Sequence, residues 1–384
     1  MKAHKLHVIM HIGSPKTGST ALQSACMAHA PALLAAGVLY PEVRSHAISH
    51  HFHGMLMLAP QQQPKVYGPT YVDQPELLQA DFAEHWQDIK RQVKRYKPSV
   101  LLLSSEALFI VPEPERAAEL RRLLDELADS FEVVAYIRRP SAFYLSKVQQ
   151  SLKHSAHLTP PGAISFRHVV ESWESQLGVP VKLAPFMRES LRDGDIFRDF
   201  ISRYLPQVSL NSQLVAKTTN ETLSAEVMAL LQDYHRCNHP DKERWRVEGS
   251  RRFRRLMEKI DVFEGSGQRP VLSADIAGQI DRSSVDLLWL NSRYGISFSG
   301  VDLAEVGANE STLNRPDYQV ADICEVDQAR KERLMLLAMQ TLLAPKINKP
   351  ARMTRWLARN QNRPWLRGLR NFIRPLRQKW SSWL

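Results

Sequence analysis

The chain has 384 residues and a formal net charge of +11. This length allows a substantial hydrophobic core, in one large domain or in two. The three cysteines include no CxxC pair, which argues against a disulfide framework and against a cysteine-rich zinc site. We find no signal-peptide pattern and no apolar run of about 18 residues, so a cytoplasmic protein without a membrane span is expected.

The positive charge is concentrated at the C-terminal end. Residues 333–384 hold 12 Lys or Arg and no Asp or Glu, which leaves a net charge of about −1 for residues 1–332. Four tryptophans interleave with these cations: Trp356, Trp365, Trp380 and Trp383. Such a segment suits an anionic membrane surface, so residues 345–384 are predicted to bind the inner membrane face peripherally. A solvated tail, or tryptophans that pack on the core, are the alternatives.

The first predicted elements are a short apolar strand, residues 8–12, and an alanine-rich helix, residues 21–36. A strand, a glycine-containing turn and a helix in this order direct backbone N–H groups toward an anion at the helix N-terminus. The intervening residues add a lysine and several hydroxyl groups. They therefore predict a phosphate-binding loop made of Gly13, Ser14, Pro15, Lys16, Thr17, Gly18, Ser19 and Thr20.

The lysine does not stand where a Walker A loop needs it. That motif places lysine directly after its second glycine and before Ser or Thr. Here Gly18 is followed by Ser19, and Lys16 lies two residues before Gly18. A P-loop nucleotide kinase would explain the loop and the helix N-terminus, and it is the alternative enzyme class. It would need lysine at the Walker A position and ligands for Mg²⁺.

Strands and helices alternate through the middle of the chain. After a histidine-rich stretch and a Gln- and Pro-rich loop, the predicted order is helix 75–97, strand 100–103, helix 114–130, strand 131–137, helix 141–153 and strand 179–184. This alternation predicts an α/β fold with a mainly parallel central sheet and helices on both faces. Ligands of such sheets bind at the C-terminal ends of the strands, where Lys16, Glu106 and Arg138 are all expected.

A second anion-binding pattern follows the strand at 131–137. Arg138 gives a forked donor suited to a phosphate, Pro140 opens the next helix, and Ser146 adds a hydroxyl almost two helical turns further on. The structural alternatives are a helix-flanking charge for Arg138 and a polar helix face for Ser146.

The two patterns together resemble the sulfotransferases that use 3′-phosphoadenosine 5′-phosphosulfate (PAPS). Pro-Lys-Thr-Gly-Ser-Thr at 15–20 resembles the family's 5′-phosphosulfate loop, and Arg138-x-Pro140-x5-Ser146 resembles its 3′-phosphate motif. The resemblance is clear over residues 6–155 and faint to 236. It implies a P-loop-like sulfotransferase fold, PAPS as co-substrate without a metal, and Lys16 at the 5′-phosphate and the leaving bridging oxygen. The family's basic, glycine-containing segment, which also binds the 3′-phosphate, has no counterpart here.

The general base that takes the acceptor's proton is left open by this resemblance. Glu106 is the first candidate, because Ser-Ser-Glu after a strand resembles bacterial sulfotransferase-like sequences; a charge at a helix N-terminus is its alternative. His53 is the second candidate, and a solvated loop is the alternative for it. A metal site at the nearby histidines is not expected, because no carboxylate or cysteine lies close in sequence. The acceptor implied by the resemblance is a hydroxyl of a saccharide or glycolipid.

The C-terminal half shows helical spacing without a recognisable motif. Helices are predicted over 195–204, 224–236, 245–260 and 274–294. We therefore divide the chain into a PAPS-binding α/β core (1–236), a mainly helical extension for acceptor binding or packing (237–344) and the basic tail (345–384). A membrane- or nucleic-acid-binding protein would explain the tail alone. No nucleic-acid partner is expected, because the tail carries no groove-reading motif.

Overall fold

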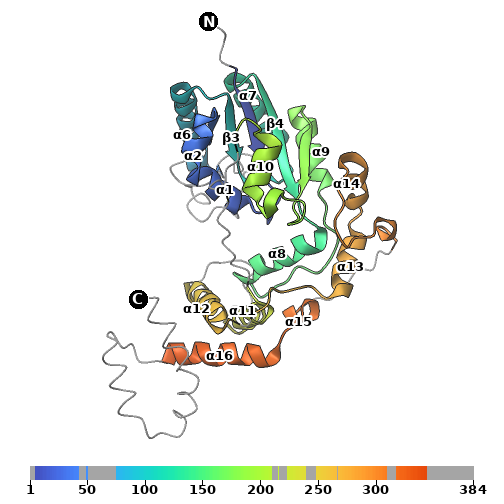
Figure 1. Ribbon diagram of the computed structural model, residues 1–384. Coiled ribbons are helices and arrows are strands. Elements are labelled where there is room, and N and C mark those ends of the chain that lie inside the picture. The colour runs from blue at the N-terminus through green and yellow to red at the C-terminus, as the bar shows by residue number, and fades with distance from the viewer. Residues whose placement is uncertain are drawn as a thin grey trace, which may run out of the picture.

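The computed structural model describes residues 5–42, 49–50, 75–209, 215, 223–238, 248–265, 267–308 and 317–343. A five-stranded, all-parallel sheet with strand order β2-β3-β1-β4-β5 forms the centre of its N-terminal part (Figure 1). The strands are β1 (His7–His11), β2 (Val38–Leu39), β3 (Val100–Ser104), β4 (Ser130–Ile137) and β5 (Val181–Pro185). The predicted α/β class with a parallel sheet is thus confirmed. Because β1 pairs with both β3 and β4, the C-terminal ends of these three strands are neighbours.

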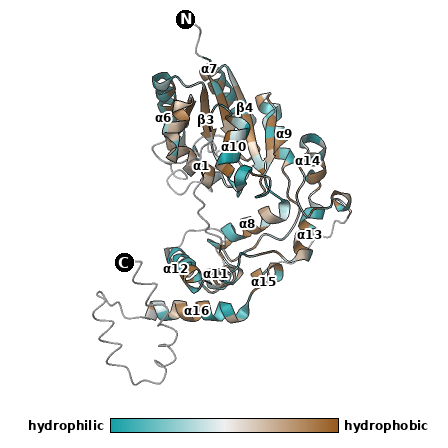
Figure 2. Cartoon of the chain, viewed as in Figure 1, coloured by the Kyte–Doolittle hydropathy of each residue, from teal (hydrophilic) through white to brown (hydrophobic). Residues whose placement is uncertain are grey.

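Helices cover both faces of the sheet, because successive strand side chains point to opposite sides. Val8, Met10 and Val133 pack in one hydrophobic cluster with side chains of α6 (Pro75–Tyr96), α7 (Pro114–Leu127) and α9 (Arg167–Leu177). Ile9 and Val134 pack in a second cluster with α1 (Ser19–Ala28), α2 (Ala30–Ala35) and α10 (Ile196–Tyr204). The strands β3 and β4 are accordingly hydrophobic along most of their length (Figure 2). Fully burying one such aliphatic side chain contributes about 1.5–3 kcal/mol.

Two predicted helices are each divided in the structure. The predicted helix 21–36 ends at Ala28 and begins again at Ala30, because Pro31 lacks the N–H that would continue the helix and its ring clashes with the preceding turn. The predicted helix 274–294 is divided into α13 (Ala274–Ser283) and α14 (Asp286–Tyr294). At that break Ser284 donates its hydroxyl to the Ile280 carbonyl, 2.7 Å away, and so competes with the helical backbone bonds.

The helix α8 (Pro140–Leu152) connects the sheet with the C-terminal helical region. Tyr144, Val148 and Leu152 share a buried cluster with α11 (Ala225–Asn238), α12 (Glu248–Glu264), α13, α15 (Val320–Ile323) and α16 (Gln328–Leu343). In Figure 1 α8 lies between the sheet and these helices. The C-terminal region is thus helical, as predicted. The helix α8 therefore forms the boundary between the sheet and the C-terminal helical region.

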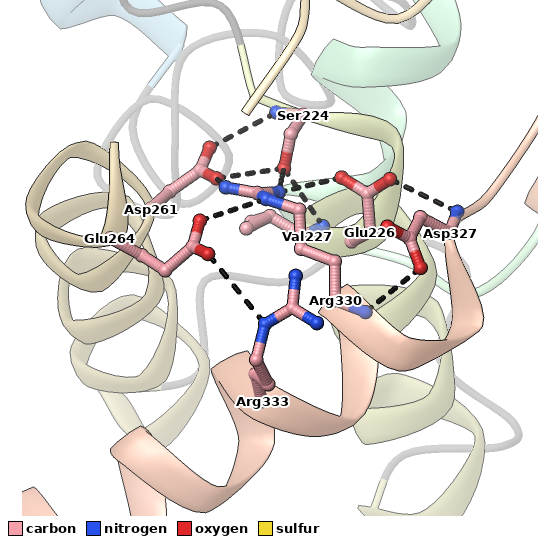
Figure 3. Close-up of polar contacts among 8 residues, drawn as sticks. All are labelled: Ser224, Glu226, Val227, Asp261, Glu264, Asp327, Arg330 and Arg333. Carbon is pink, nitrogen blue, oxygen red and sulfur yellow. Dashed lines mark hydrogen bonds and ion pairs between the residues drawn. The ribbon is translucent and has the colours of Figure 1, made fainter. Parts of the chain in front are cut away.

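A buried arginine joins three of these helices. Arg330 of α16 forms ion pairs with Glu226 of α11 at 2.6 Å and with Asp261 and Glu264 of α12 at 2.6 and 2.9 Å (Figure 3). Its side chain is 4% exposed. Removing one partner from such a buried cluster leaves uncompensated charge, which costs about 3–5 kcal/mol. Arg330 therefore holds the helical region together.

Within the described residues, no helix combines the length and the apolar character needed to cross a bilayer. The predicted basic tail, residues 345–384, lies outside the described part of the chain.

Candidate anion-binding site

The predicted phosphate loop runs from the end of β1 to the start of α1 and is tightly turned. Gly13, Lys16 and Gly18 all have positive φ angles, of 60°, 69° and 76°. A Cβ atom on Gly13 would lie 3.0 Å from Ser19 Oγ and 3.3 Å from the Cα of Glu106. Only glycine fits there without displacing a neighbour. The close approach also places the loop directly beside Glu106.

The first turn of α1 presents free hydrogen-bond donors. Gly18 is the N-cap and supplies no side-chain cap, and the first backbone bond of the helix is from Leu22 N–H to Gly18 O at 3.0 Å. The N–H groups of residues 19–21 therefore have no acceptor within the helix. Within the loop, the fully buried hydroxyl of Ser14 has no hydrogen-bond partner among the described residues. A buried hydroxyl without a partner beside unsatisfied N–H groups is suited to an anion.

Lys16 turns from the loop toward α8. Its Nζ donates to Gln150 Oε1 at 3.1 Å. Burial lowers the pKa of Lys16, nearby Lys153 and Arg138 act in the same direction, and Glu106 opposes them. The ammonium group therefore lies in a locally positive, partly desolvated environment.

The two consecutive arginines after β4 have different partners. Arg138 Nη1 donates to the backbone carbonyl of Lys16 at 3.0 Å, and its guanidinium lies 5.9 Å from the centre of the Phe186 ring. Burial lowers the pKa of Arg138, and in the described part of the chain no carboxylate forms an ion pair with it. Arg139 instead pairs with Asp281 at 2.8 Å. Arg138 is therefore the arginine available to a ligand.

Ser146 lies on the face of α8 that carries Gln150 and Lys153. Residues four and seven positions apart share one side of a helix, and Gln150 contacts Lys16. The predicted partners of a phosphate, Arg138 and Ser146, are thus on elements that border the loop. The Ser146 hydroxyl makes no hydrogen bond to the other described site residues.

Glu106 opens a short 3₁₀ turn, Glu106–Leu108, directly after β3. The turn is fixed from below, because the fully buried Trp173 donates its indole N–H to the carbonyls of Leu108 and Ile110, each at 3.0 Å. Burial raises the pKa of the Glu106 carboxyl, while Lys16 and the Ser19 hydroxyl oppose the rise, although Ser19 does not reach hydrogen-bond geometry. Glu106 is therefore a carboxyl beside Lys16 that is easier to protonate than an exposed one.

Two features of the site were not predicted from the sequence. Phe186, the first residue after β5, packs against Gly18 and Arg138. Its position close to the end of a predicted strand was the sequence feature that could have indicated a place in the site. His11, at the end of β1, is fully buried and bonds Ser104 Oγ at 2.8 Å. Burial lowers the pKa of His11 to about 3, so this ring is neutral and supports the strand ends.

The second candidate base, His53, lies outside the described residues. Nearby, His50 is held against the end of β3, since its N–H donates to the Ser104 carbonyl and its Nδ1 accepts from the Ser104 N–H, both at 2.9 Å. In the described ranges, no group of three or more His, Cys, Asp or Glu side chains is arranged to hold a metal ion.

Compared with known proteins, the chain matches no protein-family model and no curated protein at significant similarity. The functional argument therefore depends on the site itself. Its geometry combines two partly buried cations from different strand ends, a helix N-terminus and one carboxyl with a raised pKa. Such a site can bind a ligand with two separate anionic groups and can accept a proton beside one of them.

Proposed function

We propose that the protein is a PAPS-dependent sulfotransferase. The observation that carries the proposal is the pair Lys16 and Arg138: neither forms an ion pair with a carboxylate among the described residues, although burial lowers the pKa of both. A partly buried cation that lacks an ion-pair partner is unfavourable, so an anionic ligand is its natural partner. Two such cations on separate strand ends suit a nucleotide with phosphates at both its 5′ and 3′ positions.

Each side chain has a defined role in this proposal. Lys16 and the N-terminus of α1 bind the 5′-phosphosulfate, and Arg138 with Ser146 binds the 3′-phosphate. The acceptor oxygen forms a bond to sulfur while the bond from sulfur to the bridging oxygen breaks. Glu106 takes the acceptor's proton, and Lys16 stabilises the negative charge on the departing phosphate oxygen. The products are a sulfate ester and adenosine 3′,5′-bisphosphate.

The raised pKa of Glu106 supports this role, because burial shifts the carboxyl in the direction that makes it a stronger base than an exposed glutamate. The acceptor class, a hydroxyl of a saccharide or glycolipid, is proposed from the sequence resemblance to carbohydrate-modifying sulfotransferases alone. His53 stays the alternative base.

Ligand binding to the full chain tests the proposal without knowledge of the acceptor. We expect adenosine 3′,5′-bisphosphate to bind in the presence of EDTA and more tightly than adenosine 5′-phosphate, measured by calorimetry. Arg138→Met should remove about 2–5 kcal/mol of binding free energy for the bisphosphate and much less for the monophosphate. Arg122→Met is the matched control, because Arg122 pairs with Glu126 on the exposed side of α7.

The main rival, a P-loop nucleotide kinase, predicts the opposite ligand preference. ATP turnover that requires Mg²⁺, with no preference for the 3′-phosphate, would replace the sulfotransferase proposal by that one. Equal losses for both nucleotides in Arg138→Met would show that this arginine supports the fold and does not bind the 3′-phosphate.

A further inference from the structure

We propose that Asp281, in α13 of the helical region, is a positioning residue for Arg138. It holds the neighbouring Arg139 and the first turn of α8, so that Arg138 is directed at the phosphate loop. The inference rests on the proposed function, because it takes Arg138 as the residue that binds the ligand's 3′-phosphate. It gives the C-terminal helical region a part in nucleotide binding.

Asp281 receives three hydrogen bonds from the start of α8. Its Oδ2 accepts from Arg139 Nε at 2.8 Å and from Ser141 Oγ at 2.9 Å, and its Oδ1 accepts from the Ser141 backbone N–H at 3.0 Å. The carboxylate is 4% exposed. Asp281 therefore acts as an N-terminal cap of α8 supplied by a residue far away in the sequence, and it is paired with a cation at the same point.

The remaining donors of Arg139 are also bound to the helical region. Nη1 donates to the Ser299 carbonyl at 3.0 Å, and Nη2 donates to the Gly300 carbonyl at 3.1 Å. Gly300 has a φ angle of 75°, and a Cβ atom there would lie 3.1 Å from Arg139 Nη1. The absence of a side chain at Gly300 lets the guanidinium approach the backbone this closely. All three nitrogen atoms of the Arg139 guanidinium group thus donate hydrogen bonds to the helical region.

Fixing Arg139 also fixes the direction of Arg138. Only these two residues connect the end of β4, Ile137, with the start of α8, Pro140. Arg139 has φ −47° and ψ 132°, near the polyproline II conformation, in which consecutive side chains point in different directions around the chain. Arg139 is held by Asp281 and by the carbonyls of Ser299 and Gly300, and Arg138 points away from these partners and donates to the Lys16 carbonyl.

The test compares two aspartates, each of which accepts backbone hydrogen bonds at the N-terminus of another helix. Asp286, at the start of α14, accepts hydrogen bonds from the backbone N–H groups of Phe166 and Arg167 at the start of α9. Asp281→Asn and Asp286→Asn each keep an oxygen that can accept a backbone bond. Only the first loses the ion pair with Arg139. Affinities for adenosine 3′,5′-bisphosphate and adenosine 5′-phosphate are measured for both full-length variants, with the melting temperature of each.

We expect Asp281→Asn to reduce the preference for the bisphosphate over the monophosphate by about ten- to hundredfold, which lies within the coupling found between residues of one hydrogen-bond and ion-pair network. Affinity for the monophosphate should stay within about twofold, and Asp286→Asn should keep the full preference. If Asp281→Asn does not fold, Arg139→Gln replaces it, because this variant leaves the bonds from Ser141 to Asp281 in place.

Two results would overturn the inference: an unchanged preference in Asp281→Asn, or equal weakening of both ligands, which is what loss of a purely structural contact produces. A wild-type protein without any preference for the 3′-phosphate would instead overturn the proposed function, and the inference would fall with it.

Discussion

Arg330 in the helical region is buried and Arg138 beside the sheet is partly buried, yet they differ in their partners. Arg330 is surrounded by carboxylates, and its pKa is raised, because bonds to Asp261 and Glu226 outweigh the effect of burial (Figure 3). The pKa of Arg138 is lowered, since burial acts on it without a carboxylate to compensate. The first arrangement compensates the charge within the protein, and the second leaves a positive charge without a carboxylate partner among the described residues, as the proposed binding of an anion would require.

The same contrast holds for the carboxylates of the two regions. Glu226, Asp261 and Glu264 each form an ion pair with Arg330. Glu106 forms no ion pair among the described residues, and burial raises its pKa. Functional sites commonly keep such unfavourable charges, at a cost in stability, because the charges are needed for binding or catalysis.

The largest expected effect follows from removing the unpaired carboxylate. Glu106→Gln should lower the rate of sulfuryl transfer from radiolabelled PAPS to a saccharide panel by about 10²–10⁴, with donor affinity nearly unchanged. In the wild type the rate should fall as the pH drops through the raised pKa of Glu106, and the variant should lack this dependence. Glu264→Gln is the control from the other region and should keep the rate per folded molecule. A larger loss in His53→Ala than in Glu106→Gln would assign the base to His53.

Breaking the paired cluster should act on stability and not on binding. Arg330→Met removes the ion-pair partner of Glu226 and Asp261, while Glu264 keeps its ion pair with Arg333. We therefore expect a loss of about 3–5 kcal/mol in the free energy of unfolding, measured by urea titration with two probes. The bisphosphate affinity of the folded protein should be unchanged. A loss below about 1 kcal/mol would mean that the cluster contributes little to stability.

Removing the unpaired lysine should raise the stability of the ligand-free protein. The folded-state pKa of Lys16 is lowered, so its charged form destabilises the fold at pH values below that pKa, and this penalty fades as the pH rises toward the unfolded value of 10.5. Lys16→Met should therefore melt at a higher temperature than the wild type at pH 7, and the difference should shrink near pH 10.

The same lysine should be needed for catalysis, since loss of a donor to a developing oxyanion lowers kcat by about 10²–10³. If Lys16→Ala kept more than half of the wild-type rate with unchanged PAPS affinity, this result would show that Lys16 does not take part in the reaction. A lower melting temperature of ligand-free Lys16→Met would show that Lys16 stabilises the fold.

The smallest effect on either region is expected from removing the tail after Pro345. Melting temperature and bisphosphate affinity should be unchanged, while sedimentation with anionic vesicles at low salt should be lost, since each cation near such a surface contributes about 1 kcal/mol. The last described helix, α16, exposes Leu336, Met339 and Leu342 just before the tail, which favours an apolar surface as partner. Equal recovery of both proteins in the lipid pellet would contradict the membrane prediction.

The parts of the molecule that could be predicted are those with local signals. The strand at 100–103 and the loop around Lys16 are defined by neighbouring residues, and both were found within a residue or two. Pro31 indicates a break in the first helix, but the alanine-rich sequence around it favoured the prediction of a single helix. The pairing of Arg139 with Asp281 joins residues 142 positions apart, so no local sequence pattern predicts it. The helix α16 was also missed, because its apolar residues occur on several faces and show no clear period.

The bond between Ser141 and Asp281 has a consequence during synthesis. It spans 140 residues, which a ribosome adding about 5–20 residues per second takes about 7–28 s to complete. Within that interval the last strand of the sheet, β5, is made, whereas α13 is made only at its end. A nascent chain can therefore complete its sheet before the contact with Asp281 forms, and under the proposed function its ability to bind the nucleotide's 3′-phosphate would arise later than the sheet.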